Sequence, residues 1–238
     1  MCKCLTLDSV SLAMGEERIL KDISLDVMQG ERLVVLGESG SGKTSLLRLV
    51  AGFVAPDTGS VWLGGVIASR DGDIILPPER RNIGMVFQDL ALWPHMSVRG
   101  NVEFGLRARG FPGAEREGRV RDILAILDME NLMDRMPGQL SGGQRQRVAL
   151  ARALVYEPEI LLMDEPLSNL DSELGVRIRH ELIELHHRLD FTLVYVTHNR
   201  EEAMDIATNA VVLDNGRLNH LEKDQILPGQ CRQKGLMP

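Results

Sequence analysis

A glycine-rich stretch is the clearest candidate for chemistry in this chain: Gly37-Glu38-Ser39-Gly40-Ser41-Gly42-Lys43-Thr44. It fits the pattern G-x-x-x-x-G-K-[ST], in which glycines let backbone N–H groups surround phosphates at the start of a helix. We predict that the loop binds a nucleoside triphosphate, with Lys43 on the β- and γ-phosphates and the Thr44 hydroxyl on Mg²⁺. The alternative is a plain turn rich in glycine and serine.

Two carboxylates follow an apolar run in the second half of the chain. Asp164 and Glu165 come directly after Ile160-Leu161-Leu162-Met163. A carboxylate at the end of a buried strand holds Mg²⁺ through water in P-loop NTPases, so we assign Asp164 to the metal. Glu165 would orient and deprotonate an attacking water. The alternative is a solvated pair of acids at the end of a strand.

A third segment, Leu140-Ser141-Gly142-Gly143-Gln144, precedes a helical pattern. Ser141 is a natural N-cap, and the two glycines expose a second helix N-terminus to an anion. This segment has no lysine of its own, so we predict that it completes a nucleotide site on another chain. Taken alone, it also fits an ordinary capped helix.

The apolar spacing predicts strands that alternate with helices around these segments. Strands are expected near residues 5–10, 23–27, 32–36, 61–63, 83–87, 160–163, 192–196 and 210–213. Helices are expected after residue 44, up to Gly52, and over residues 172–189, with a mainly helical stretch at 89–157. This order predicts a parallel sheet covered by helices, into which a helical lobe is inserted.

Composition excludes several classes of protein. The 238 residues are 44% hydrophobic, as in a chain that folds around a core, and the net charge of -7 disfavours a nucleic-acid partner. The first residues, MCKCLTLDSV, contain no apolar run long enough for a signal peptide, and no run elsewhere reaches the roughly 18 residues that a membrane span needs. We therefore expect a cytosolic chain that reaches a membrane only through a partner.

Two weaker patterns have a metal-binding and a structural interpretation. Cys2 and Cys4 would supply half of a zinc site, but no further ligand lies near them, and with Cys231 they are too few for a disulfide framework. His180, Glu184 and His187 share one helix face, for which we expect a solvated surface.

Five segments in order, GESGSGKT, LSGGQRQR, ILLMDEP, PLSNLD and VTH, resemble the ATP-binding subunit of an ABC transporter. The likeness runs from about Leu5 to Leu218, and LSGGQ separates this family from other P-loop ATPases. It implies an α/β P-loop NTPase fold: a RecA-like parallel sheet core, an N-terminal antiparallel β subdomain and an inserted α-helical subdomain. A single domain would then cover 1–238, with a core lobe at about 1–88 and 158–220, a helical lobe at about 89–157, and a short tail at 221–238 without a regulatory domain.

The resemblance also implies roles for residues that have no clear signal alone. Gln88 would contact Mg²⁺ and the attacking water, while Ser168 and Asp171 would carry signals across a dimer. His198 would hold the γ-phosphate and the catalytic water beside Glu165, although a lone histidine at a strand end is more often structural. ATP and Mg²⁺ are the implied cofactors, shared by a head-to-tail homodimer or a pair of ABC ATPases.

One position departs from the family pattern. Met14-Gly15 stands where relatives place an aromatic residue that stacks on adenine, and a thioether gives a weaker contact than an aromatic face. Met14 is therefore predicted to lie at the base, with altered nucleotide affinity. Asn199 follows His198 where many relatives have aspartate, a change that we expect to be tolerated.

The segment after Gln88 resembles that of importers of sugars, ferric iron and polyamines, in Trp93-Pro94-His95 and in the preceding Pro77–Gly84. Its apolar residues would either form a groove for a helix of a membrane partner or pack inside the helical lobe; they are Leu90, Leu92, Trp93, Met96 and Val98.

The expected function is thus ATP hydrolysis coupled to solute import. Partners would be integral-membrane permease subunits and an extracytoplasmic solute-binding protein, with no nucleic acid, and the chain would lie peripherally on the cytoplasmic side of the cell membrane. A soluble ABC-type ATPase acting on DNA or ribosomes is one alternative. The single cassette and the compact stretch between Lys43 and Asp164 argue against it. An exporter's ATPase is the other alternative.

Overall fold

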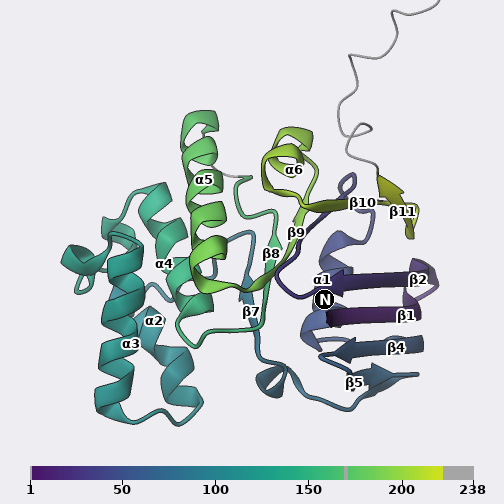
Figure 1. Cartoon of the computed structure of the whole chain (residues 1–238), viewed down its shortest axis with the longest axis horizontal. Helices are drawn as coiled ribbons and strands as arrows, with labels where there is room; N and C mark the ends of the chain where they lie inside the picture. The colour runs from purple at the N-terminus through teal and green to yellow at the C-terminus, as the bar shows by residue number, and fades with distance from the viewer. Residues whose placement is uncertain (1, 169–170, 222–238) are drawn as a thin grey trace, which may run out of the picture.

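The computed structural model describes residues 2–168 and 171–221, which fold into two β-sheets and a set of helices (Figure 1). The central sheet has the strand order β11-β10-β3-β9-β8-β7. Its strands are β3 (Arg32–Leu36), β7 (Ile83–Val86), β8 (Ile160–Asp164), β9 (Thr192–Thr197), β10 (Asn209–Asp214) and β11 (Arg217–Leu221). Neighbouring strands from β10 to β7 run parallel, and β11 pairs antiparallel with β10 in a hairpin.

The parallel strands are buried on both faces, which explains their continuous apolar sequences. Along β8, Leu161 and Met163 join one hydrophobic core while Ile160 and Leu162 join the other. Successive side chains of a strand point to opposite faces, so a strand between two cores needs no polar face.

The second sheet is antiparallel and has the order β2-β1-β4-β5-β6. Its strands are β1 (Lys3–Met14), β2 (Glu17–Met28), β4 (Thr58–Leu63), β5 (Val66–Arg70) and β6 (Asp73–Ile74). The helix α1 (Lys43–Ala51) shares a hydrophobic core with this sheet and with one face of the central sheet. The glycine-rich loop that precedes α1 therefore starts from a buried strand and ends in a buried helix.

The remaining helices pack against the other core. Figure 1 shows α2, α3 and α4 gathered at the end of the molecule opposite the antiparallel sheet, with α5 and α6 nearer the central sheet. Their bounds are α2 (Val98–Ala108), α3 (Gly113–Ile126), α4 (Gly142–Leu154), α5 (Ser172–Leu189) and α6 (Arg200–Ile206). Three single-turn 3₁₀ helices lie in the connections, at Pro78–Arg80, Glu130–Leu132 and Pro137–Gln139.

A buried guanidinium fixes the C-terminal end of α1. Arg81 donates to the carbonyls of Leu49 and Val50, in the last turn of α1, and to the carbonyl of Ala68 in β5. Burial lowers the pKa of Arg81 to about 10. The partial negative charge at a helix C-terminus stabilises this cation, which links α1 to the segment leading into β7.

The predicted strands and the long helix at 172–189 are confirmed, and the inserted stretch is helical. Two details were wrong or missing. The strand expected at 83–87 ends at Val86, and the sequence analysis missed α6, β5, β6 and β11. These elements are short and mostly half-exposed, so they carry too few apolar residues for a clear period.

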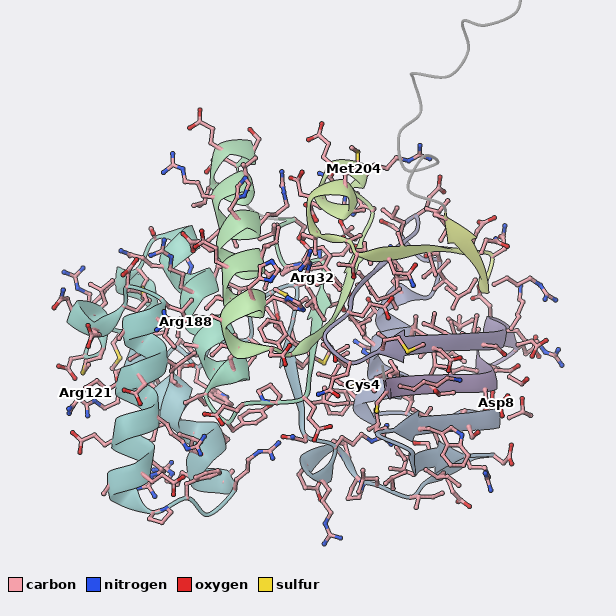
Figure 2. The ribbon with its side chains drawn as sticks, viewed as in Figure 1. Cys4, Asp8, Arg32, Arg121, Arg188 and Met204 are labelled. Atoms are coloured by element: carbon pink, nitrogen blue, oxygen red, sulfur yellow. The ribbon has the colours of Figure 1, made fainter. Side chains whose placement is uncertain are left out.

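The outer surface carries charged side chains, among them Arg121 on α3 and Arg188 on α5 (Figure 2). His180, Glu184 and His187 are also exposed, which confirms the solvated helix face. Cys4 is buried, burial raises the pKa of its thiol, and Cys2 is exposed. Within residues 2–168 and 171–221, no group of three or more His, Cys, Asp or Glu side chains could hold a metal ion. In the same residues, no helix is both long enough and apolar enough to cross a membrane.

Candidate nucleotide site

The loop Gly37–Thr44 connects β3 to α1 and has the conformation of an anion cradle. Gly40 and Gly42 adopt left-handed backbone conformations, with φ of 83° and 104°, which favour glycine. A Cβ on Gly37 would lie 2.6 Å from the carbonyl oxygen of Leu213. Among the described residues no side chain caps α1, so the N–H groups of its first turn remain available for an anion.

Lys43 lies almost fully buried across its own loop. Its Nζ donates to the carbonyl oxygens of Gly37 and Glu38, each at 2.8 Å, and lies 3.2 Å from Oε1 of Glu165. The loop thus already holds the ammonium at its centre. A phosphate entering the loop would meet this cation together with the backbone donors.

The two predicted ligands of the metal lie side by side although 120 positions separate them in the sequence. The Thr44 hydroxyl donates to Oδ1 of Asp164 at 3.1 Å. Burial raises the pKa of Asp164 above its ordinary value, and the hydrogen bond from Thr44 opposes this shift. A buried carboxylate beside a hydroxyl is a donor set that suits Mg²⁺.

A buried hydroxyl adds to this fit. Oγ of Ser41 is fully enclosed and has no hydrogen-bond partner among the described residues. Buried polar groups are rarely left unpaired, so a phosphate oxygen or an ordered water in the loop would satisfy it. The loop and the Thr44–Asp164 pair together fit a nucleotide with its Mg²⁺.

Glu165 joins the glycine-rich loop to the end of β9. Its Oε2 lies 2.9 Å from Nδ1 of His198, while its Oε1 faces Lys43. β8 and β9 are parallel neighbours, so both residues emerge at the same edge of the sheet. Glu165 has φ of 41°, a left-handed conformation that is uncommon for this residue type and typical of functional sites.

A buried network that the sequence analysis missed supports this edge. Glu202 of α6 accepts hydrogen bonds from the hydroxyls of Tyr195 and Thr197, both at 2.8 Å. Burial, followed by the neighbouring Glu202, raises the pKa of Tyr195 well above its ordinary value. Only tertiary contacts identify Glu202, because an acidic residue in a short helix normally faces solvent.

Asn199 caps α6, the helix that follows His198. Its side-chain oxygen accepts from the backbone N–H groups of Glu201 at 2.8 Å and Glu202 at 3.4 Å. Asparagine and aspartate are equally good N-caps, so the helix beside His198 begins normally.

Gln88 lies next to Ser168, with its Nε2 3.5 Å from Oγ of Ser168. Both side chains are exposed and lie near the end of β7 and β8 respectively. The contact brings together the predicted water-sensing glutamine and the first residue of the predicted dimer-signalling segment. Two residues of that segment, Asn169 and Leu170, lie outside the described residues. The metal contact of Gln88 stays a prediction.

The segment Leu140–Gln144 begins α4 with a complete capping box. Oγ of Ser141 accepts from the Gln144 N–H at 3.3 Å, and Oε1 of Gln144 accepts from the Ser141 N–H at 2.9 Å. Gly143 packs against α5, where a Cβ would lie 3.0 Å from Cδ1 of Leu174. Asp171 caps α5 by accepting from the Leu174 N–H at 2.9 Å, so the start of α5 lies against the start of α4.

The two loops lie in different parts of one protomer. In Figure 1, α1 and α4 lie on opposite sides of β8, α1 beside the antiparallel sheet and α4 in the helical group. The structure therefore brings together Lys43, Thr44, Asp164, Glu165 and His198, whereas α4, which begins after Ser141, lies in the helical group.

Met14 ends β1 and is exposed, in the turn that leads to β2. The start of β2 and the glycine-rich loop line a common cavity of about 210 Å³, whose walls include Arg18, Ile19, Ser39 and Gly40. Met14 pairs with Glu17, another residue of that wall. This places Met14 in the hairpin that borders the cavity, as a contact with the base requires.

The apolar residues after Gln88 do not all lie in the same environment. Some pack inside the protein, and others lie at the surface, where a partner could bind. Val98 is fully buried and Leu90 and Leu92 pack against the core, which confirms internal packing for these three. Trp93 is half-buried, with its ring 4.4 Å from that of the exposed Phe104. Met96 lines a surface cavity of about 200 Å³ with Phe104.

Known proteins resemble this chain over most of its length. The family model described as ABC transporter matches residues 20–168. The maltose/maltodextrin import ATP-binding protein MalK of Yersinia pestis is 48% identical over 218 residues, which are 92% of this chain and 58% of that protein. A putative ATP-binding protein of Brucella abortus is 46% identical over 92% of this chain and 61% of its own length. The chain thus spans about three fifths of the curated relatives it matches.

Solved structures agree in fold. The cbiO1 protein of Clostridium perfringens, described as part of the ABC transporter complex cbiONQ, has a TM-score of 0.82 and 31% identity, over 92% of this chain and 88% of that one. A dimeric post-hydrolysis state of the ATP-binding cassette MJ0796, bound to ADP and Pi, has a TM-score of 0.78 and 33% identity, over 92% and 99%. The predicted P-loop NTPase fold is confirmed. With its glycine-rich loop, its paired strand-end carboxylates and these relatives, the chain belongs to the ABC transporter family.

Proposed function

We propose that this chain hydrolyses ATP to ADP and phosphate and thereby drives solute import through a membrane permease. One observation carries the proposal: Lys43, Glu165 and His198 form a continuous chain of contacts at the edge of the sheet. Thr44 and Asp164 lie beside it. The glycine-rich loop would bind the phosphates, and Thr44 and Asp164 would hold the Mg²⁺ that neutralises their charge. The Glu165 carboxylate would act on the attacking water.

ATP would bind with its phosphates in the loop Gly37–Thr44. The backbone N–H groups at the start of α1 and the ammonium of Lys43 would hold the β- and γ-phosphates. Thr44 and Asp164 would hold Mg²⁺, with Gln88 as a third contact, and the ion supplies positive charge against the phosphate oxygens. Met14 would lie against the base.

Hydrolysis would be an in-line attack of water on the γ-phosphorus. The water oxygen bonds to the γ-phosphorus while Glu165 takes a proton from the water. The bond between the γ-phosphorus and the β–γ bridging oxygen breaks, which releases ADP. The hydrogen bond from His198 fixes the Glu165 carboxylate. The contact between Lys43 and Glu165 adds control: phosphates that draw Lys43 toward them release Glu165 for its role as base.

Two chains would form the working unit. The segment at Ser141 lies apart from the Lys43 loop of its own protomer and carries no lysine, so it would cover the nucleotide of a second copy or of a paired ABC ATPase. Ser168 and Asp171 would contact the partner between the two sites. The dimeric state of the MJ0796 cassette, bound to ADP and Pi, supports this arrangement.

Coupling to transport would use the helical lobe, which we assign to about 89–157 between core segments 1–88 and 158–220. The cavity lined by Met96, Phe104 and Arg107 would receive a segment of the permease. The similarity to MalK, named for maltose import, supports import with a permease and an extracytoplasmic binding protein. The chain would then lie peripherally at the cytoplasmic side of the membrane.

The variant Glu165→Gln tests the proposed hydrolysis. It keeps the size of the side chain and one acceptor oxygen but cannot accept a proton, so we expect turnover to fall at least about 100-fold while Mg-ATP binding persists. ATP should then hold the variant as a dimer in size-exclusion chromatography. Glu201→Gln, an exposed substitution on α6, is the matched control and should hydrolyse ATP normally. Normal turnover by Glu165→Gln would remove Glu165 from the role of base.

A further inference from the structure

The segment that follows Gln88 contains two consecutive residues in a disfavoured conformation. Leu90 has φ of 61° and Ala91 has φ of 44°. This left-handed region is uncommon for residues other than glycine because Cβ approaches the carbonyl oxygen. Such a pair persists only where the surroundings hold it.

Arg152 of α4 provides that hold. Its two terminal nitrogens donate to the carbonyl oxygens of Ala91 and Leu90, at 2.5 and 2.6 Å. The guanidinium also lies over the ring of Trp93, 5.0 Å from the ring centroid. Only the planar fork of arginine can reach two neighbouring carbonyls while stacking on an aromatic face.

The other half of the same segment is held from α2. Asn101 is fully buried, and its side-chain nitrogen donates to the carbonyls of Trp93, Met96 and Ser97, each at 3.1 Å. Its oxygen accepts from the Trp93 N–H at 2.9 Å. Two side chains therefore hold the segment from residue 90 to 97. Arg152 bonds to the part nearest to Gln88, where the Leu90 N–H also donates to the carbonyl of Phe87, and Asn101 bonds to the rest.

The position of Arg152 along α4 gives this contact a further consequence. The N-terminus of the same helix carries Ser141, the candidate contact to a partner's nucleotide. Gln88 lies beside Ser168, and it comes two and three residues before Leu90 and Ala91, whose carbonyls Arg152 bonds. The helix α4 thus connects two segments. One is the segment after Gln88, at the protomer's own nucleotide site, and the other is the segment at Ser141, which would face the nucleotide of a partner.

We propose that Arg152 is a positioning residue that holds Leu90 and Ala91 in their left-handed conformation. It thereby keeps Gln88 at the nucleotide edge and ties it to α4. This proposal rests on the proposed ATP hydrolysis. It differs from simple packing because it predicts an effect on turnover that a comparable arginine of the same lobe does not have.

The chain offers such a comparable arginine. Arg109, at the end of α2, lies over the ring of Tyr156 with 4.1 Å to the centroid, so it also stacks on an aromatic residue between α2 and α4. It lies outside the proposed nucleotide and partner sites. Arg109→Gln therefore matches Arg152→Gln in chemistry and in lobe.

The first test compares these two variants as full-length chains. We expect Arg152→Gln to lower kcat for ATP about tenfold, with KM and the ATP dissociation constant within about twofold of the parent chain. Amide hydrogen exchange at residues 89–93 should become faster. Arg109→Gln should change neither kcat nor this exchange. Equal losses of kcat in both variants, or no change in Arg152→Gln, would overturn the proposal.

A rescue experiment tests the mechanism. Glycine adopts the left-handed region freely. Adding Ala91→Gly to Arg152→Gln should therefore raise kcat at least about threefold above that of Arg152→Gln alone. Ala108→Gly, in the last turn of α2, is the control and should restore nothing. Failure of Ala91→Gly to restore activity would show that Arg152 does not act through the backbone conformation.

Hydrogen exchange also separates this proposal from the proposed function. If the parent chain hydrolysed no ATP, the proposed function would fail, whereas faster exchange at residues 89–93 in Arg152→Gln alone would still support the hold on the segment. If the parent chain is active and Arg152→Gln exchanges normally, only the positioning role is lost.

Discussion

The two glycine-containing helix starts, Gly37–Thr44 and Leu140–Gln144, look alike in sequence but are satisfied differently. At Ser141 the chain completes its own hydrogen bonds, because Ser141 and Gln144 cap each other. At the start of α1 no described side chain provides a cap, and Lys43 bonds to the carbonyls of its own loop. One helix start is chemically complete, and the other has donors that an anion would satisfy.

This difference gives the two helix starts different expected roles. The start of α1 would bind the nucleotide, and the start of α4 would complete the site around a nucleotide bound by another chain. A helix N-terminus without a cap, with a buried ammonium beside it, gains the most from a phosphate. A capped helix N-terminus without a cation gains little alone, but it offers a preformed, rigid surface to a phosphate already bound elsewhere. The comparison therefore predicts that changes near Lys43 alter binding, whereas changes at Ser141 alter hydrolysis.

The largest effect that would test this comparison is expected from Ser141→Arg. A long side chain at the second helix start should block the approach of a partner, so ATP hydrolysis should fall about 100-fold while ATP binding by the separated chain is unchanged. Equilibrium binding and steady-state turnover measure the two quantities. A loss of ATP binding in this variant would show that the two loops are not distinct in role.

The substitution Ser141→Arg also removes the N-cap of α4, and this loss of stability needs its own control. Removing an N-cap costs about 1 kcal/mol of stability. Ser97 caps α2 by accepting from the Gly100 N–H, so Ser97→Ala reproduces that loss without changing the segment at Ser141. Thermal unfolding of both variants separates the stability loss from the effect on turnover.

A smaller effect, on stability, is expected from Asp164→Asn. Burial raises the pKa of Asp164, so without nucleotide the folded chain loses stability as pH rises from the ordinary carboxyl pKa through the raised value. Asparagine lacks this cost and can still accept from Thr44. We expect the variant to be about 1 kcal/mol more stable than the parent chain at pH 8, with the difference vanishing in acid, although Mg²⁺-dependent hydrolysis is lost.

Unfolding in denaturant between pH 4 and pH 8 measures this difference. Asp122→Asn, an exposed change on α3, controls for net charge and should show no such pH dependence. If the parent chain were more stable than Asp164→Asn at pH 8, the ionised carboxylate would not destabilise the fold in the absence of a cation, and the prediction would be wrong.

The smallest effect is expected from Met14→Tyr at the border of the first loop. An aromatic face on the base adds about 0.5–1.5 kcal/mol, so the ATP dissociation constant should fall by about twofold to twelvefold. Met204→Tyr on α6 is the matched control, because Met14 and Met204 are 45% and 43% exposed. Equal affinities in a titration of the two variants would remove Met14 from the base.

The segments that we assign to phosphate binding were predictable because their signals are local. Glycines at fixed spacing, a lysine and a following hydroxyl describe the loop without reference to the rest of the chain. Ser141 as an N-cap and the strand that ends at Asp164 were likewise predictable from neighbouring residues. Each of these features depends on hydrogen bonding or periodicity within about ten positions.

The supporting residues could not be predicted in this way. Glu202 and Arg152 look like ordinary helix-surface charges, and nothing in their local sequence shows that they bond to Tyr195 or to the carbonyl of Leu90. Leu90 and Ala91 are also poor candidates for left-handed backbone, since such positions favour glycine or asparagine. Their conformation follows from contacts with Arg152, which is 61 and 62 residues away in the sequence.

The amino-acid sequence determined the strand–loop–helix units, their caps and the glycine-rich loop with its lysine and hydroxyl, because these depend on short-range sterics and hydrogen bonds. The tertiary structure decided that Thr44 meets Asp164, that Glu165 lies between Lys43 and His198, and that Arg152 holds the segment after Gln88. Those pairings depend on the order of parallel strands and on helix packing, which bring together residues that no local pattern connects.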